Sequence, residues 1–224
     1  MHAEATEPRA ARTQRLRGLY AITPEVADTA LLRSQVDAAI TGGANAVQYR
    51  NKTAAREQRV EQARVLAELC RSRDVLFVVN DDPEIAAQVN ADGVHLGEDD
   101  GPLEAARRTI GPSRIVGVSC YNDLTRARAM ADAGADYLAF GSVFASSVKP
   151  GARRASLDLL HRARVLGVCV VGIGGIDGDN AADVIEAGAD AVAVISAVFA
   201  ADDIEGAARD IAQACARAGA DERY

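Results

Sequence analysis

Gly188-Ala189-Asp190-Ala191-Val192 is a run of small residues that leads into an apolar stretch, and the chain contains three close variants of it. The variants are Gly43-Ala44-Asn45-Ala46-Val47, Asn90-Ala91-Asp92-Gly93-Val94 and Gly134-Ala135-Asp136-Tyr137-Leu138. Successive copies lie about twice as far apart as a minimal strand–helix unit of roughly 25 residues, so the phrase marks every second unit. The units without the phrase contribute further apolar strands, at residues 18–23, 75–80, 115–119 and 168–173. The sequence therefore predicts eight strands.

The stretches between these strands have the composition and apolar spacing of amphipathic helices. Examples are residues 53–73, 123–133 and 179–187. Thr53 and Asp123 are expected N-caps, and Gly134 and Gly188 are expected at helix ends. Strand–helix alternation implies parallel strands, and eight near-equal units favour an α/β protein that closes into a (β/α)8 TIM barrel. The alternative, an open doubly wound sheet, is less favoured because no Gly-x-Gly-x-x-Gly follows the first strand.

Length and composition indicate one domain and exclude several classes of partner. The 224 residues are 49% hydrophobic, which suffices for one sizeable core. A net charge of −7, only 4% aromatic residues and the lack of a basic stripe argue against a nucleic-acid partner. No apolar run approaches the roughly 20 residues of a membrane span, and no secretory signal opens the chain. The four scattered cysteines are typical of buried thiols, so we expect a cytoplasmic protein without a membrane partner.

The expected domain boundaries lie close to the two ends of the chain. Residues 1–15 are polar and mixed in charge, so we expect a flexible N-terminal tail. Residues 16–219 are expected to form the catalytic barrel, and residues 220–224 a short C-terminal tail. No linker interrupts the barrel. Self-association into a homo-oligomer stays open at this stage.

Polar residues collect directly after several of the strands, where α/β enzymes place their chemistry. After the second strand, Gln48, Arg50 and Lys52 alternate and should point one way, while Val47 and Tyr49 pack outward against helices. Alternate residues are roughly 7 Å apart along a strand. Arg and Lys at that separation suit two linked phosphoryl groups, so the run predicts a cationic clamp for a diphosphate.

Two acidic clusters follow the third and fourth strands, Asn80-Asp81-Asp82 and Glu98-Asp99-Asp100. Neighbouring strands are about 4.8 Å apart, so the clusters can converge. Two carboxylates near 4 Å repel by about 4 kcal/mol at the effective dielectric of a protein surface, and a magnesium ion would reverse that sign. Asp82 precedes Pro83 and resembles a helix N-cap. The spacing alone does not select which carboxylates would bind the metal.

A second anion site is expected after the last two strands. Gly172-Ile173-Gly174-Gly175-Ile176 and Ser196 occupy the usual phosphate-binding corner of such barrels. Glycines let backbone amides approach an anion. Residues 141–150 are Ser-rich, include Lys149, and are interpreted as a mobile lid. Because no protein nucleophile is evident, two anion sites favour the joining of two substrates with release of diphosphate, by positioning and charge stabilisation. His95 is expected to be packed or hydrogen-bonded.

Taken together and in this order, the runs resemble the signature motifs of the thiamine-phosphate synthase (thiamine-phosphate pyrophosphorylase) family. The resemblance extends from about residue 18 to 199, through residues 48–52, 79–82, 93–100, 117–119, 140–144 with Lys149, and 173–176. It implies a transferase that couples hydroxymethylpyrimidine diphosphate with hydroxyethylthiazole phosphate to give thiamine phosphate and diphosphate. In such a reaction the diphosphate departs dissociatively, and the thiazole nitrogen captures the pyrimidine cation.

The resemblance also implies the roles of individual residues. Asp81 and Asp100 would ligate the cofactor, Mg²⁺. Arg50, Lys52, Ser119 and Lys149 would be catalytic. The substrate-binding residues would be Gln48, Tyr49, Arg50, Asn51, Lys52, Asn80, Ser119, Ser146, Ser147, Val148, Lys149, Gly175, Ile195 and Ser196.

One position departs from the family's pattern. The lid normally carries two hydroxyl residues, usually threonines, on either side of one position before the lysine. Here these positions hold Ser146 and Val148, so one hydroxyl is lost, although Ser147 can substitute for it. The departure bears on the thiazole-phosphate contact and not on the diphosphate clamp.

Two further functions remain open from the sequence. A thiazole tautomerase-like isomerase would use the same fold but would need neither clamp nor metal, and the retained cations and carboxylates speak against it. A non-catalytic barrel that senses thiamine precursors would bind the pyrimidine diphosphate without releasing diphosphate. Turnover distinguishes these functions.

Overall fold

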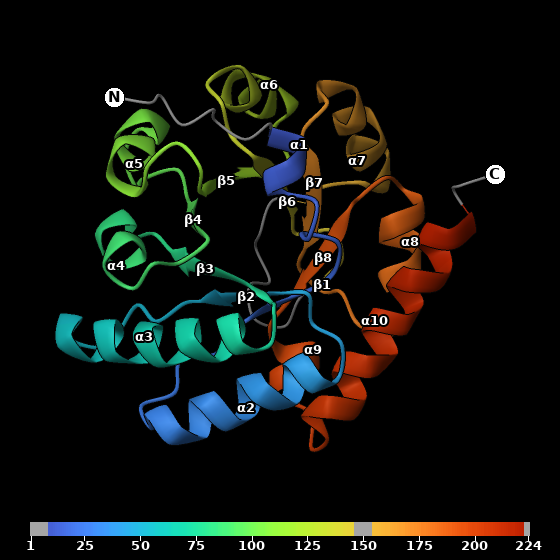
Figure 1. Cartoon of the computed structure of the whole chain (residues 1–224). Coiled ribbons are helices and arrows are strands. Elements are labelled where there is room, and N and C mark those ends of the chain that lie inside the picture. Colours follow the sequence, from blue (N-terminus) through green and yellow to red (C-terminus); the bar gives the residue numbers. More distant parts are fainter. Residues whose placement is uncertain (1–8, 146–153, 222–224) are drawn as a thin grey trace.

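The computed structural model describes residues 9–145 and 154–221 and has eight parallel strands that pair in chain order. β8 pairs with β1, so the sheet closes into a barrel with the helices outside it (Figure 1). The predicted (β/α)8 barrel is confirmed. The strands are β1 Gly18–Ile22, β2 Ala46–Tyr49, β3 Leu76–Asn80, β4 Gly93–Leu96, β5 Ile115–Tyr121, β6 Tyr137–Gly141, β7 Cys169–Ile173 and β8 Ala191–Val194.

The described helices follow the strands in alternation, with a short helix before β1 and two helices after β8. They are α1 Arg9–Arg12, α2 Thr29–Thr41, α3 Arg56–Ser72, α4 Pro83–Gln88, α5 Leu103–Ile110, α6 Leu124–Asp132, α7 Leu157–Ala163, the 3-10 turn η1 Arg164–Leu166, α8 Ala181–Glu186, α9 Ser196–Phe199 and α10 Ile204–Asp221. Asp123 caps α6 as predicted, by accepting hydrogen bonds from Thr125 and Arg126. Gly134 and Gly188 follow α6 and α8 with φ of 96° and 103°, a left-handed conformation that suits glycine.

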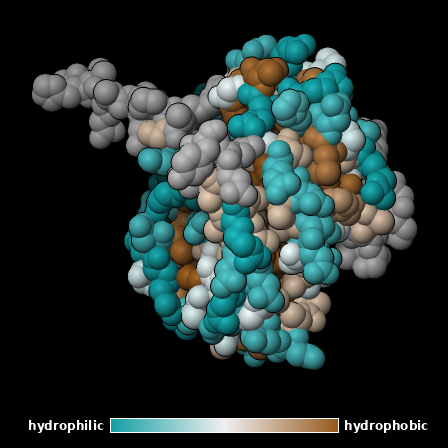
Figure 2. Space-filling view, turned by 90° about the vertical axis from the view of Figure 1, so that its right-hand side faces the viewer, coloured by the Kyte–Doolittle hydropathy of each residue, from teal (hydrophilic) through white to brown (hydrophobic). Residues whose placement is uncertain are grey.

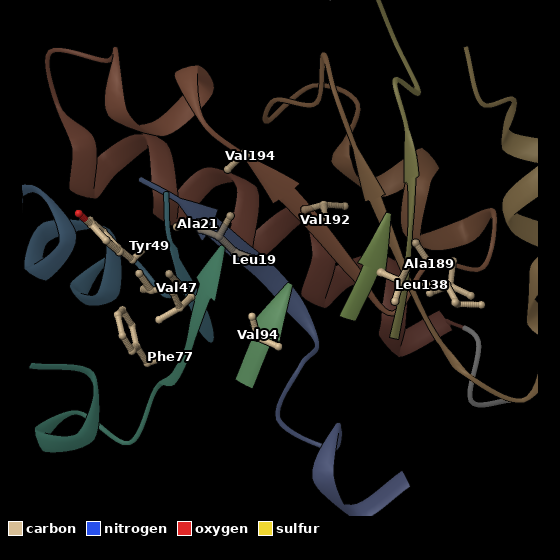
Figure 3. Close-up of a cluster of buried hydrophobic side chains, with 14 of the residues drawn as sticks. Leu19, Ala21, Val47, Tyr49, Phe77, Val94, Leu138, Ala189, Val192 and Val194 are labelled. Carbon is tan, nitrogen blue, oxygen red and sulfur yellow. The ribbon is translucent and has the colours of Figure 1, made fainter. Parts of the chain in front are cut away.

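Successive residues of a strand point to opposite faces of the sheet, so the strands contribute to two separate apolar cores. One set fills the barrel and includes Tyr20, Val78 and Tyr137. The other set, with Val47 and Phe77, packs against the helices, and Figure 3 shows part of it. The position of a residue in this alternation therefore decides whether its side chain faces the barrel interior or the helix layer.

The repeated small-residue phrase has a structural role before the even strands. Asp92, Asp136 and Asp190 stand directly before β4, β6 and β8. Each exchanges two hydrogen bonds with one residue of the preceding strand, since its N–H donates to that residue's carbonyl and its carboxylate accepts from that residue's N–H. The strand residues are Phe77, Val116 and Val170, at 2.8, 2.8 and 2.9 Å from the carboxylates. The phrase thus fixes the register of neighbouring strands.

Residues 9–15, which fall within the expected N-terminal tail, contact the barrel through α1 and the residues after it. α1 lies across one end of the barrel (Figure 1), and Arg12 forms an ion pair of 2.5 Å with Asp136. Arg15 and Arg17 reach Asp92 and Asp190 at 3.6 and 3.7 Å. These arginines meet the aspartates of the repeated phrase, and this attraction holds the segment in place. At the other end, α10 continues to Asp221, beyond the expected boundary at residue 219.

The face of the molecule that Figure 2 shows is predominantly polar. On the face seen in Figure 2, hydrophilic residues form bands along the helices, with apolar residues between them. Cys70, Cys120 and Cys215 are buried and free, as the composition predicted, and Cys169 is half-buried. Among the described residues, no helix combines the length and the apolar character that crossing a bilayer requires.

The buried carboxylate of Asp136 provides a test of the fold. It pairs with Arg12 and Arg107 and accepts from the Val116 N–H, whereas the Asp190 side chain is 31% exposed. Asp136→Ala removes a fully buried carboxylate from two arginines and from the Val116 N–H, so we expect it to lower the free energy of unfolding by about 3–5 kcal/mol. The matched variant Asp190→Ala should cost about 1 kcal/mol. Urea unfolding measures both, and equal losses would contradict the role given to Asp136.

Candidate active site at the carboxyl ends of the strands

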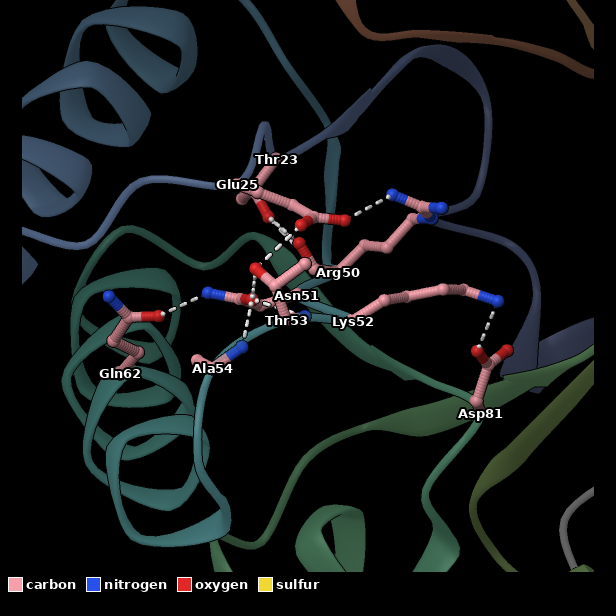
Figure 4. Close-up of polar contacts among 9 residues, drawn as sticks. All are labelled: Thr23, Glu25, Arg50, Asn51, Lys52, Thr53, Ala54, Gln62 and Asp81. Atoms are coloured by element: carbon pink, nitrogen blue, oxygen red, sulfur yellow. Dashed lines mark hydrogen bonds and ion pairs between the residues drawn. The ribbon is translucent and has the colours of Figure 1, made fainter.

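The predicted clamp residues leave β2 toward the mouth of the barrel. Gln48 is 3% exposed and lies inside the barrel, where its amide donates to the Tyr20 hydroxyl at 2.8 Å. The Arg50 and Lys52 side chains extend to the same side of the loop in Figure 4. Arg50 pairs with Glu25 at 3.2 Å, and Lys52 Nζ lies 2.9 Å from Asp81 Oδ2. The two cations are therefore held by carboxylates from two other loops.

Glu25 is a site residue that sequence reasoning missed. Its carboxylate accepts from the Thr53 hydroxyl at 2.8 Å and also pairs with Arg50 (Figure 4). The Thr53 hydrogen bond, together with the Lys52 N–H and the Arg50 charge, lowers the pKa of Glu25. Glu25 follows β1 without any polar cluster around it, so only the pairing of β1 with β2 reveals its place. It orients the Arg50 guanidinium.

The Tyr49 side chain faces away from the mouth in which its substrate contact was expected. The Tyr49 side chain is buried against α3, and its hydroxyl donates to Gln62 Oε1 at 2.8 Å. The alternation of the strand turns this position away from the barrel, which is the outward packing that the pattern itself indicated. Burial raises the pKa of Tyr49 to about 12. Tyr49 therefore anchors β2 to the helix layer.

Asn51 holds the loop that carries Lys52. Its Nδ2 donates to Gln62 at 3.2 Å, and its Oδ1 accepts from the backbone N–H groups of Thr53 and Ala54 (Figure 4). The expected N-cap at Thr53 is wrong, because α3 begins at Arg56. An Asn side chain that satisfies two consecutive amides forms a local turn in place of the first helical turn.

The two predicted metal ligands lie together in the mouth. Asp81 follows β3 with φ of 64°, a left-handed conformation that aspartate tolerates better than most residues, and its N–H donates to the His95 carbonyl at 2.8 Å. Asp100 Oδ2 accepts from the Gly97 N–H at 2.6 Å. Burial, and next the adjoining Asp81 carboxyl, raise the pKa of Asp100. The two carboxyl groups are therefore in contact, although 18 residues separate them, because β3 and β4 are neighbours.

The other acidic residues of these loops have different roles. Asp82 caps α4 by accepting from the Ile85 N–H at 3.0 Å, as Pro83 after it predicted. Glu98 and Asp99 are exposed. In the described part of the chain, no group of three or more His, Cys, Asp or Glu side chains is arranged to hold a metal ion. Asp81 and Asp100 together offer two carboxylates, fewer than such a group contains.

A chain of buried polar side chains crosses the barrel below the mouth. The Tyr20 and Tyr137 hydroxyls lie 3.0 Å apart, and the Tyr137 hydroxyl lies 2.8 Å from His95 Nδ1. His95 Nε2 lies 2.9 Å from Ser119 Oγ. Burial lowers the pKa of His95 to about 4, so the ring is neutral at physiological pH. The expectation that His95 is hydrogen-bonded is confirmed, while Tyr20 and Tyr137 were missed because tyrosine in a strand is typical of packing.

The predicted phosphate corner lies at the ends of β7 and β8, which pair with each other. Gly174 and Gly175 have φ of 97° and 68°, and a Cβ at Gly175 would lie 2.6 Å from the Ala145 carbonyl. Ile195 and Ser196 follow β8, and Ser196 is exposed at the start of α9. Asn80 ends β3, in register with His95. The predicted lid contacts, Ser146, Ser147, Val148 and Lys149, lie outside the described residues.

Asp100 provides a test of the contact between the carboxyl groups. Its pKa in the folded protein lies above that in the unfolded chain, so the contribution of this carboxyl to folding is fully present only below its ordinary pKa of about 3.9. This contribution is lost as pH rises through the raised value. Asp100→Asn should therefore raise Tm at pH 7 in metal-free buffer and change it less at about pH 3. Thermal melts measure this, with exposed Asp99→Asn as control, and a lower Tm at pH 7 would contradict the contact.

Comparison with known proteins agrees with the motifs. The family model described as thiamine monophosphate synthase matches residues 19–198. The thiamine-phosphate synthase of Methylobacillus flagellatus is 52% identical over 198 residues, covering 88% of this chain and 95% of the relative. That of Aromatoleum aromaticum is 54% identical over 190 residues, covering 84% and 91%. The solved thiamine phosphate pyrophosphorylase from Pyrococcus furiosus superposes with a TM-score of 0.82 at 38% identity, covering 93% of this chain and 98% of that one.

Proposed function

This chain belongs to the thiamine monophosphate synthase family, and from that membership we propose how its residues perform the reaction. It is a transferase of thiamine biosynthesis that acts on small molecules and forms thiamine phosphate. The resemblance seen in the motifs is thereby confirmed. The substrates are hydroxymethylpyrimidine diphosphate and hydroxyethylthiazole phosphate, and diphosphate is the second product. The net charge of −7 supports small-molecule substrates over nucleic acid, and we place the enzyme in the cytoplasm.

The observation that carries the mechanism is the convergence of Lys52, Asp81 and Asp100 at the ends of three neighbouring strands. In the free protein Lys52 neutralises Asp81, and Glu25 holds Arg50. A bound diphosphate offers both cations stronger anionic partners. Arg50 then forks onto phosphoryl oxygens, while Lys52 supplies a point charge.

Asp81 and Asp100 would hold Mg²⁺. The fit rests on the contact between the Asp81 and Asp100 carboxyl groups, which together offer oxygen ligands. The pKa of Asp100 is raised, and a divalent cation would stabilise the charged form of this carboxyl. When bound, the ion neutralises charge on the departing diphosphate. When Lys52 turns to the substrate, Asp81 is free to act as a ligand.

The remaining predicted residues would position the two substrates. Gln48, Asn80 and Ser119 line the interior side of the mouth and hold the pyrimidine diphosphate, and Gly175, Ile195 and Ser196 hold the thiazole phosphate. The carbon–oxygen bond of the pyrimidine diphosphate breaks with both electrons going to the diphosphate. The lone pair of the thiazole nitrogen then forms the new carbon–nitrogen bond. No protein nucleophile is needed, so catalysis is positioning and stabilisation of the leaving charge.

The alternative functions are less well supported. A tautomerase would have no use for the carboxylate pair beside Lys52. A non-catalytic sensor would bind the pyrimidine diphosphate without producing diphosphate. Incubation of the purified protein with both substrates and Mg²⁺ decides between the three, and formation of thiamine phosphate supports the synthase.

Asp81→Ala tests the metal assignment. The variant loses one of two ligands, so we expect thiamine phosphate formation to fall by at least about 100-fold. The fold should survive, because the Asp81 side chain is 25% exposed at a strand end, and alanine at φ of 64° should lower the free energy of unfolding by only about 1 kcal/mol. Asp99→Ala, in the same mouth but exposed, should keep activity. Full activity of the wild-type protein in EDTA would refute the assignment.

Lys52→Ala tests the clamp. Because Lys52 is assigned to the diphosphate, its loss should lower kcat/KM for the pyrimidine diphosphate by about 10- to 100-fold. The KM for thiazole phosphate should change by less than about twofold, since that substrate lies at β7 and β8. Steady-state kinetics with each substrate varied in turn measures both constants. The reverse pattern would assign the clamp to the other substrate.

A further inference from the structure

Five polar side chains from five strands form a continuous path through the barrel interior. Gln48 on β2 donates to the Tyr20 hydroxyl on β1 at 2.8 Å, and Tyr20 lies 3.0 Å from the Tyr137 hydroxyl on β6. Tyr137 contacts His95 Nδ1 on β4 at 2.8 Å, and His95 Nε2 contacts Ser119 Oγ on β5 at 2.9 Å. The path therefore begins and ends at residues of the proposed site. Its middle members have no role in the mechanism above.

A glycine makes the path sterically feasible. β5 lies between the strands of His95 and Tyr137, and the residue in register with both is Gly117. A Cβ at Gly117 would lie only 1.9 Å from the Tyr137 ring. Because that Cβ is missing, the ring lies over β5 and stacks on His95 with 5.5 Å between centroids and 20° between planes. The contact between Tyr137 and His95 thus depends on the absence of a side chain at Gly117 in β5.

The donors and acceptors along the path give it one direction. The Gln48 amide nitrogen can only donate, so the Tyr20 oxygen accepts from it. Tyr20 and Tyr137 are 1% and 0% exposed, and in the described structure the Tyr137 hydroxyl is the remaining partner for the Tyr20 proton. A buried hydroxyl proton without an acceptor is costly, so Tyr20 donates to Tyr137. Tyr137 in turn donates to His95 Nδ1.

This direction extends to the mouth. Since Nδ1 accepts, the His95 proton sits on Nε2, which donates to Ser119 Oγ. The Ser119 oxygen thus accepts from inside the barrel, and its own proton remains to be donated. Ser119 is half-buried at the end of β5, where the carboxyl ends of the strands open.

We propose that Tyr20, Tyr137 and His95 are positioning residues that orient Ser119 as a hydrogen-bond donor to the diphosphate, with Gln48 setting the direction of the path. The proposal rests on the proposed function, because it assumes that the diphosphate lies in this mouth. No proton is transferred. The Ser119 hydroxyl donates a hydrogen bond that strengthens as negative charge develops on the leaving oxygen.

The tautomer of His95 tests the path without any substrate. The chain has three histidines, so ¹⁵N imidazole spectra of the wild-type protein at pH 7 can be assigned with a His95→Asn variant. The proposal requires a neutral ring with hydrogen on Nε2. A ring protonated on Nδ1, or a charged ring, would overturn the direction of the path. This measurement stands even if the protein forms no thiamine phosphate, a result that would refute only the proposed function.

A double-mutant cycle tests the action through Ser119. Tyr137→Phe alone should lower kcat/KM for the pyrimidine diphosphate by about fivefold, and Ser119→Ala alone by about tenfold or more. If Tyr137 acts through Ser119, adding Tyr137→Phe to Ser119→Ala should cost less than about twofold more. A merely structural tyrosine would give losses that multiply, which would overturn the proposal. Tyr20→Phe gives a second cycle with the same expectation, should Tyr137→Phe fail to fold.

Discussion

Closure of β8 onto β1 is the constraint on which the rest of the molecule depends. Once eight parallel strands form a ring, all their carboxyl ends lie on one rim, and strand alternation assigns each side chain to the interior or to the helix layer. Gln48 and Tyr49 are adjacent in sequence, yet one lies within the barrel and the other anchors β2 to α3. Residues far apart in the chain, such as Lys52 and Asp81, meet for the same reason.

Charge is distributed differently at the two ends of the barrel. At the amino end, Asp136 is buried, paired with two arginines and hydrogen-bonded to a strand, an arrangement that serves stability. At the carboxyl end, Asp81 pairs with Lys52, whose side chain is 54% exposed. Asp100 lies beside the carboxylate of Asp81, a group of the same charge. The second arrangement is unfavourable in isolation and becomes favourable when a cation and a diphosphate arrive. The same residue type thus holds the scaffold at one end and binds ligand at the other.

Much of this could be predicted from the sequence, because the strand phrases and the polar clusters are local signals. The eight strands, the cap at Asp123, and Asp81 and Asp100 as the acidic pair all follow from runs of a few residues read with the family resemblance. Glu25, Tyr20 and Tyr137 could not be found, since each acquires its role only from strands that pair across the barrel. Tyr49 was assigned to the substrate together with the rest of its motif, whereas the alternation of the strand turns its side chain toward α3. The contacts of Arg12 and Arg15 with the barrel could not be predicted either, because their partners lie more than 50 residues away in the chain.

The central claim is that the Asp81 and Asp100 carboxylates bind one divalent ion together with the diphosphate. The most direct measurement is anomalous diffraction from crystals grown with Mn²⁺ and hydroxymethylpyrimidine diphosphate. The account predicts a single strong peak between the two carboxylates, in contact with phosphate oxygens and with Lys52 moved from Asp81 to the diphosphate. A peak elsewhere, or carboxylates too far apart to share one ion with the substrate bound, would contradict it.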